Sequence, residues 1–340
     1  MEILYIIGNG FDLNLGLKTS YNHFYQYYKT VEAKNFNVIK LKENISKTYD
    51  SWADLELALG NYTQYLESTE ELDDILLDIG EALSKYLRIE ENKLENFEID
   101  QRKFFNYLCF PENMFLPADK ENLIKIKSNW TNSQWILNIF TLNYTSVIEK
   151  IVGDKHNDLI LAYHNNSRAI QLGEIKHIHG YLDNDMVIGV DDITQIKNES
   201  FHGNRDVLES IVKSECNHAN RNNVDRQFTN KINTANLICI FGSSIGETDN
   251  KWWKLIGERL KSDCHLIIFT KGSEVSPRIR HLQARTERNF KRFFLDKTNL
   301  SDDEKTKVEG KIFIGLNSAM FNGIVNKSEK SILNPVENKA

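Results

Sequence analysis

The sequence contains little cysteine: four residues in 340, widely separated and without a C-x-x-C pair. Zinc ribbons and disulfide frameworks need closely spaced or regularly paired cysteines, so the sequence disfavours both and fits a reducing cytosol. Cys239 and Cys264 lie inside apolar runs and are expected to be small core residues. We expect no metal site.

Long apolar runs and an excess of basic residues are also absent. No run approaches the ~20 residues that a membrane span needs, and Met1 and Glu2 lead into a strand-like run without a basic leader. We therefore expect a cytoplasmic protein with no membrane partner. The net charge of -6 is not typical of a protein that binds duplex nucleic acid, because such proteins carry an excess of positive charge. The one notable basic stretch, residues 271–292, fits a solvated helix face better than a nucleic-acid site.

A glycine-rich turn follows the first apolar run. Gly8, Asn9 and Gly10 end that run, and Gly16 follows within two helical turns. Glycine has no Cβ, so a phosphate can approach the backbone closely and meet free N–H groups. Leu13 stands where the dinucleotide fingerprint requires a third glycine. The turn therefore predicts a nucleotide-like ligand or a tight turn without a ligand, with neither favoured.

Strand-like and helix-like patterns alternate along much of the chain. Strands are predicted at 136–140, 159–163, 175–179, 186–188, 237–241 and 265–269, and several are apolar on both faces. Helical periodicity is found at 206–217, 251–261 and 277–290. This alternation predicts an α/β fold with a doubly wound, mostly parallel, Rossmann-like sheet.

The stretch between residues 51 and 130 has a different character, because amphipathic helical patterns replace the strands. It predicts an inserted α-helical subdomain. The expected division is a nucleotide-binding core of residues 1–50 and 131–296, the helical insertion of residues 51–130, and a C-terminal extension of residues 297–340. No internal repeat or low-complexity linker is visible.

Four turns follow predicted strands, at residues 8–10, 141–145, 177–180 and 241–246. The carboxyl ends of parallel strands share one edge, so we expect these turns to meet at one crevice. Their small and amide side chains suit a ribose and phosphates better than an apolar ligand.

His179 is the sharpest catalytic candidate. It ends a strand beside Gly180, and its side chain titrates nearest working pH, so it is suited to be a general base. His177 lies two residues earlier on the same strand face. A metal held by both histidines with Asp183 or Asp185 is a weaker alternative.

Other polar residues of the turns have two readings each. Asn143 either holds a ribose hydroxyl or a water, or caps the helix that begins near Thr145. Asp12 either acts in the site or caps the first helix. Ser243 and Ser244 resemble phosphate or ribose ligands more than a nucleophile, because the G-x-S-x-G elbow is absent.

Residues outside these turns are also candidates. Asp54 and Glu56 either project over the crevice or are ordinary surface charges of packed helices. Asp249 or Asn250 is expected to cap the next helix.

Several phrases closely resemble the AbiH family of bacterial phage abortive-infection proteins, over most of the chain. They are Ile6-Ile-Gly-Asn-Gly-Phe-Asp-Leu, Gly16-Leu-Lys-Thr-Ser-Tyr21, Trp52-Ala-Asp-Leu-Glu56, Asn143-Tyr-Thr145, His177-Ile-His-Gly180 and Phe241-Gly-Ser-Ser-Ile-Gly-Glu-Thr-Asp249. The combination is specific, although each phrase alone is weak. The resemblance implies a role in antiviral defence, with a phage-encoded trigger and a homo-oligomer as candidate partners.

The order of the turns is also similar, more distantly, to that of sirtuin-like (SIR2-like) domains. The matching positions in the NAD-site turns of such domains are Gly8, Gly10 and Gly16, then Thr141 and Asn143, then His179 and Gly180, then Gly242, Ser243 and Ser244. Asn9 replaces an alanine, Asp12 a serine and Thr145 an aspartate. The sirtuin zinc-binding cysteines are absent, which disfavours deacetylation.

This second resemblance implies that NAD is the ligand or substrate and that its hydrolysis starves the infected cell. In that reading His179 is the base, Asn143 holds the ribose or water, and Asp12 stabilises the cation. Two alternatives remain: a nucleotide sensor that signals through the helical insertion, and a nuclease that binds Mg2+ through Asp183, Asp185, Asp191 and Asp192. Net acidity disfavours the nuclease and any nucleic-acid partner.

Overall fold

The computed structural model describes residues 1–153, 159–165, 167–273 and 277–327. Its main sheet has seven strands in the order β4-β5-β3-β1-β6-β7-β8. They are β1 (Glu2–Ile7), β3 (Trp135–Thr141), β4 (Ile160–His164), β5 (Arg168–His177), β6 (Leu237–Phe241), β7 (His265–Thr270) and β8 (Ile312–Leu316). Neighbouring strands are parallel except β4 and β5. The predicted mostly parallel α/β sheet is confirmed.

The strand order reverses beside β1. When the antiparallel edge strand β4 is left out, the strands follow the order 3-2-1-4-5-6 across the sheet. Doubly wound folds with this order bind ligands at the carboxyl ends of the strands, where the order reverses. The topology therefore predicts a ligand site at the carboxyl ends of β1, β3 and β6.

Helices cover both faces of the sheet. Ile3, Tyr5 and Ile7 of β1 pack into one core cluster, whereas Leu4 and Ile6 pack into another. This period of two buries both faces, which explains why the central strands read as continuous apolar runs. The first face carries α1 (Gly10–Asn14), α6 (Gln101–Cys109), α7 (Pro117–Ser128) and α8 (Val147–Val152). The second carries α11 (Val224–Thr234), α12 (Asn250–Leu260), α13 (Arg280–Asp296) and α14 (Asp302–Val308).

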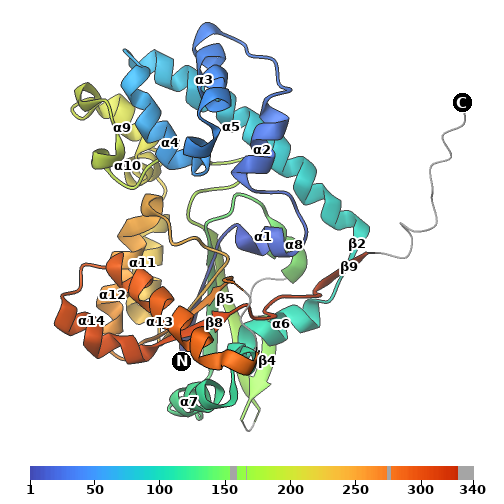
Figure 1. Ribbon diagram of the computed structural model, residues 1–340. Helices are drawn as coiled ribbons and strands as arrows, with labels where there is room; N and C mark the ends of the chain where they lie inside the picture. Colours follow the sequence, from blue (N-terminus) through green and yellow to red (C-terminus); the bar gives the residue numbers. More distant parts are fainter. Residues whose placement is uncertain (154–158, 166, 274–276, 328–340) are drawn as a thin grey trace, which may run out of the picture.

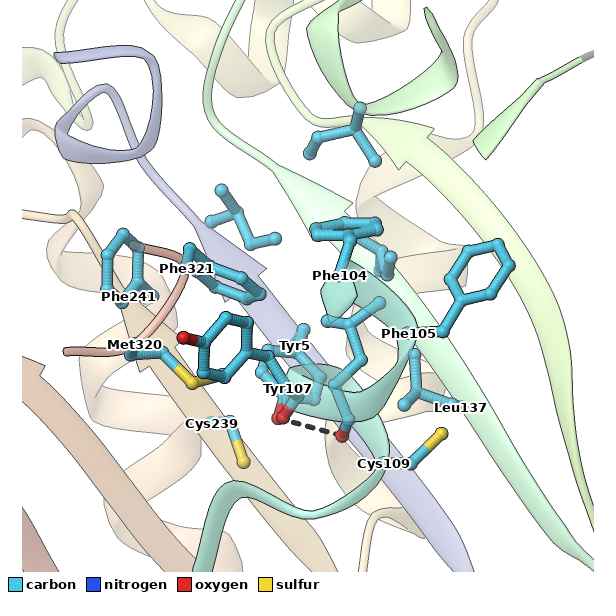
Figure 2. Packing of buried hydrophobic residues seen from close by; sticks show 14 of the residues in the cluster. Tyr5, Phe104, Phe105, Tyr107, Cys109, Leu137, Cys239, Phe241, Met320 and Phe321 are labelled. Carbon is cyan, nitrogen blue, oxygen red and sulfur yellow. Dashed lines mark hydrogen bonds between the residues drawn. The ribbon is translucent and has the colours of Figure 1, made fainter. Parts of the chain in front are cut away.

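Aromatic side chains hold α6 against the first face. Figure 2 shows Phe104 and Tyr107 of α6 together with Tyr5 and Phe321. The Phe104 and Phe321 rings lie 5.4 Å apart, and the buried Tyr5 hydroxyl donates to the Leu108 carbonyl at 2.9 Å. Residues from the expected insertion and from the expected C-terminal extension thus complete the core of the sheet.

A third core cluster lies among helices at one end of the sheet (Figure 1). These helices are α2 (Tyr21–Tyr28), α3 (Phe36–Lys47), α4 (Leu55–Tyr62), α5 (Thr69–Asn92) and α9 (Arg205–Ile211). We call them the helical layer, together with α10 (Lys213–Ala219), which packs against α9. The Ser20 side chain caps α2 at its amino end, because it accepts from His23 N–H. The stretch 51–130 therefore divides, with α4 and α5 in this layer and α6 and α7 on the sheet.

Two local predictions were wrong. Residues 186–188 form no strand; Ile188 is apolar because it packs into the core of the helical layer. The helix predicted at 206–217 is two helices that meet at Val212. Val190 breaks it, because its N–H donates to the Ile211 carbonyl and its carbonyl accepts from Lys213 N–H.

The chain after residue 296 also contributes to the sheet. β8 lies in it beside β7, and β9 (Val325–Lys327) forms a separate antiparallel pair with β2 (Phe97–Ile99).

The four cysteines are buried and free. None of the helices in the described ranges is long and apolar enough to cross a membrane.

Candidate functional site

A cavity of about 710 Å³ opens at the carboxyl ends of β1, β3, β5 and β6. Ligand pockets of proteins commonly measure roughly 300–1,000 Å³. Its wall contains Gly8, Asn9, Gly10, Asp12, Asn143, His179, Gly242, Ser243 and Ser244. Asp54, Glu56, Leu83 and Leu87 of the insertion line it too. The structure thus brings the four turns and the helical layer to one cavity.

The glycines of the first and fourth turns pack against each other. Gly8 N–H donates to the Phe241 carbonyl at 2.9 Å, and Gly10 N–H donates to the Gly242 carbonyl at 2.8 Å. A Cβ on Gly10 would lie 2.5 Å from the Gly242 Cα. Both N–H groups are therefore used within the protein. Close contact between two turns, rather than a free phosphate cradle, explains these glycines.

Asp12 forms a buried cluster with Asn143 and Thr145. It is 1% exposed, and it accepts from Asn143 Nδ2 at 3.1 Å and from Thr145 Oγ1 at 2.6 Å. Burial raises the pKa of Asp12 to about 7, although the two hydrogen bonds oppose the increase. Asn143 Oδ1 is buried and has no hydrogen-bond partner among the described residues. One buried amide oxygen in the cluster is thus left without a protein donor among the described residues.

His179 is fixed through its Nε2 atom. This nitrogen lies 2.9 Å from Asp249 Oδ1, and the histidine is 3% exposed. Burial alone would raise the pKa of Asp249, but the charges of Lys213 and His179 outweigh burial and hold that pKa well below its usual range. An ionised carboxylate only accepts, so His179 Nε2 is the donor in this contact. Nδ1 has no partner in the described part of the chain.

Lys213 is the residue of this network that sequence reasoning missed. Its ammonium lies 2.9 Å from Asp249 Oδ1 and 2.8 Å from Glu56 Oε2, and it donates to the Thr248 carbonyl at 2.8 Å. Burial alone would lower the pKa of Lys213, but Asp249 and Glu56 raise it above its ordinary value. A lysine on a polar helix carries no sequence signal for such a role.

The structure decides between the two interpretations given above for Glu56 and Asp54. Glu56 is buried and also accepts from the Tyr144 hydroxyl at 3.1 Å, so it is not a surface charge. Asp54 lines the cavity and also caps α4, because it accepts from Glu56 N–H and Leu57 N–H. Asp249 precedes α12 as expected, but its side chain makes no cap hydrogen bond and turns to His179 and Lys213 instead.

Three of the expected nucleotide-binding residues are not among those lining the cavity: Gly16, Thr141 and Gly180. Thr141 Oγ1 donates to the Ile7 carbonyl and accepts from Asn143 N–H, so it ties two strand ends together. Gly180 has φ of 75°, and a Cβ there would meet the Asp185 carbonyl oxygen at 1.9 Å. Both residues shape the turns. Ser243 and Ser244 do line the cavity, and Ser243 Oγ also accepts from Ile245 N–H at 3.0 Å.

His177 and two aspartates of the nuclease alternative, Asp183 and Asp191, have partners within the protein. The ring nitrogens of His177 lie 2.7 Å from the Asn143 carbonyl and 2.8 Å from Glu149 Oε1. Asp183 pairs with Arg88. Asp191 accepts from Lys251 N–H, at 3.0 Å. Within the described ranges no group of three or more His, Cys, Asp or Glu side chains could hold a metal ion.

Comparison with known proteins bears on the whole site. Residues 4–270 match a family model described as "Bacteriophage abortive infection AbiH". No curated protein matches the sequence. The matched range contains the four turns, Glu56, Lys213 and Asp249, and it covers more than half of the chain. The chain belongs to the AbiH family of bacteriophage abortive-infection proteins.

Proposed function

We propose that this chain, within the phage-defence role that its family implies, binds NAD or a closely related nucleotide and hydrolyses its nicotinamide–ribose bond. One observation carries the proposal. Asp12, Asn143 and His179 come from three different strand ends and line one cavity where the strand order reverses. A ribose held there would face an amide, a carboxyl group and an imidazole.

The chemistry requires one water and one base. In the proposed reaction the bond between the ribose C1′ and the nicotinamide nitrogen breaks, and the electron pair leaves with nicotinamide. Water adds to C1′ and loses its proton to His179 Nδ1, which releases it to solvent. The transition state resembles an oxocarbenium ion, as in glycoside hydrolysis. Asp249 supports this role because it fixes the ring through Nε2.

Asp12 is suited to stabilise the developing cation. A negative charge buried near the ribose would interact strongly with it, because little water screens the pair. The pKa of Asp12, about 7, means that this charge is gained as pH rises through neutrality. We therefore expect NAD hydrolysis to increase between about pH 6 and pH 8. A rate that is flat over this range would remove Asp12 from the mechanism.

The test is to incubate the purified protein with NAD, alone and with extract of infected cells, and to follow nicotinamide release. His179→Ala should abolish release, because no base remains. His265→Ala is the matched control, since His265 lies at the opposite, amino end of β7 and should leave the rate unchanged. Circular dichroism would establish that both variants are folded. Release by His179→Ala at the wild-type rate would refute the assigned base.

A nucleotide sensor without turnover is the second candidate. It is favoured by the Asp12 cluster, because Asn143 and Thr145 already occupy the two carboxylate oxygens. A bound ribose would then meet Asn143 Oδ1 rather than a free acid. Protein that retains NAD or ADP-ribose through purification, yet releases no nicotinamide in infected-cell extract, would support sensing over hydrolysis.

A further inference from the structure

A single buried ammonium group joins the helical layer to His179. Lys213 begins α10, and its three N–H donors meet Glu56 of α4, the Thr248 carbonyl and Asp249. The Lys213 and Glu56 side chains are each 8% exposed. All the hydrogen-bonding capacity of the ammonium is thus used, out of contact with bulk water.

Lys213 and His179 donate to the same carboxylate oxygen of Asp249. Asp249 Oδ1 accepts from Lys213 Nζ and from His179 Nε2, both at 2.9 Å. Removing the lysine would leave the carboxylates of Glu56 and Asp249 buried without that cation. In a poorly hydrated site an unpaired carboxylate is strongly disfavoured, so the negative charge left on Asp249 would favour a second proton on the imidazole beside it. That proton would change the state of His179.

We propose that Lys213 is a positioning residue: held by Glu56 of the helical layer, it keeps Asp249 against His179 Nε2, so that the imidazole is correctly oriented only while that layer is in place. The inference rests on the proposed function, in which His179 Nδ1 accepts a proton. If Lys213 has this role, activity depends on α4 and α10 being packed in their native positions.

Other charged groups surround this network and stay constant in the test. Asp191, Asp225 and Lys251 line a small cavity together with His179 and Lys213. Lys251 Nζ pairs with Asp225 at 2.8 Å. Asp54 lies near the amino end of α4 as its cap. Lys213→Met and Glu56→Gln, the two test variants below, leave all of these charges in place.

The experiment is NMR of the full chain labelled with 15N-histidine, with the His179 signals assigned from His179→Gln. We expect the native neutral ring to carry its hydrogen on Nε2. In Lys213→Met the pH at which the ring gains its second proton should move upward by about one unit or more, because a nearby positive charge is lost. Lys127→Met is the matched control: Lys127 is another buried lysine, paired with Glu112 at 2.7 Å, and it should leave His179 unchanged.

Glu56→Gln tests the link to the helical layer and decides the matter if Lys213→Met does not fold. It removes a negative charge, so the same midpoint should move downward. A folded Lys213→Met with native His179 titration, or a Glu56→Gln with no change, would overturn the proposal. Nicotinamide release is measured separately. Shifted titrations without any hydrolysis would support the positioning role and reject only the proposed function.

Discussion

The free energy of unfolding of the wild-type protein should decrease as pH rises, and replacing Asp12 by asparagine should remove this decrease. The carboxyl group is buried and accepts two hydrogen bonds, yet burial raises its pKa from 3.8 to about 7. Asparagine keeps the shape and cannot ionise, but its amide nitrogen cannot accept one of the two hydrogen bonds. Because that lost acceptor has the same effect at every pH, the difference in pH dependence between wild type and variant isolates the free energy that is needed to keep a charge at this position.

The sign and size follow from proton linkage. The unfolded chain releases the Asp12 proton near pH 3.8, whereas the folded chain holds it to about pH 7. Between these values the folded state binds more protons, so the free energy of unfolding decreases as pH rises. A difference of about three pKa units corresponds to about 4 kcal/mol. The loss should be complete above pH 7 and absent below about pH 4.

The assay is urea unfolding of wild type and Asp12→Asn at intervals from pH 4 to pH 8. We expect the variant to gain up to about 4 kcal/mol relative to wild type across this range. Asp303→Asn is the control, because Asp303 is exposed and should leave the pH dependence unchanged. Parallel pH curves for wild type and Asp12→Asn would refute the reasoning, since they would mean that Asp12 is ionised throughout.

Two further predictions concern packing, and both are measured by urea unfolding. Gly10→Ala should destabilise the protein by about 1–3 kcal/mol, because its Cβ would meet the backbone of Gly242. Gly80→Ala, in α5 with open space around the added methyl, should instead stabilise by about 0.5–1 kcal/mol; equal effects would refute the close-contact argument. Tyr5→Phe should cost about 1 kcal/mol because the Leu108 carbonyl loses its buried donor, and no loss would mean that this hydrogen bond is not stabilising.

Local patterns were sufficient for much of the fold. Short continuous apolar runs gave β1, β6 and β7, and the alternation with helices gave the parallel sheet. These features depend on neighbours in sequence, so a single chain reveals them. The run at 186–188 misled because burial under helices produces the same apolar pattern as a strand. Periodicity cannot distinguish the two causes.

The candidate site was visible only in part. Strand-end positions suggested that Asp12, Asn143 and His179 would meet, because parallel strands share an edge, and the cavity contains all three. For the glycines of the first turn the sequence left two interpretations open, because it cannot distinguish contact with a ligand from contact with another turn; the structure shows contact with another turn. Lys213 escaped notice because its three acceptors lie 35 or more residues away in the chain.

The amino-acid sequence by itself determined the alternation of strands and helices, the turns at the strand ends and the family, since each is written in contiguous residues. Only the tertiary structure decided that α6, α7 and β8 complete the sheet and its core, and which acids are buried. It also decided that one lysine holds Glu56 and Asp249 together. Burial and charge pairing arise from segments that meet after folding, and they determine the ionisation on which the chemistry of this cavity depends.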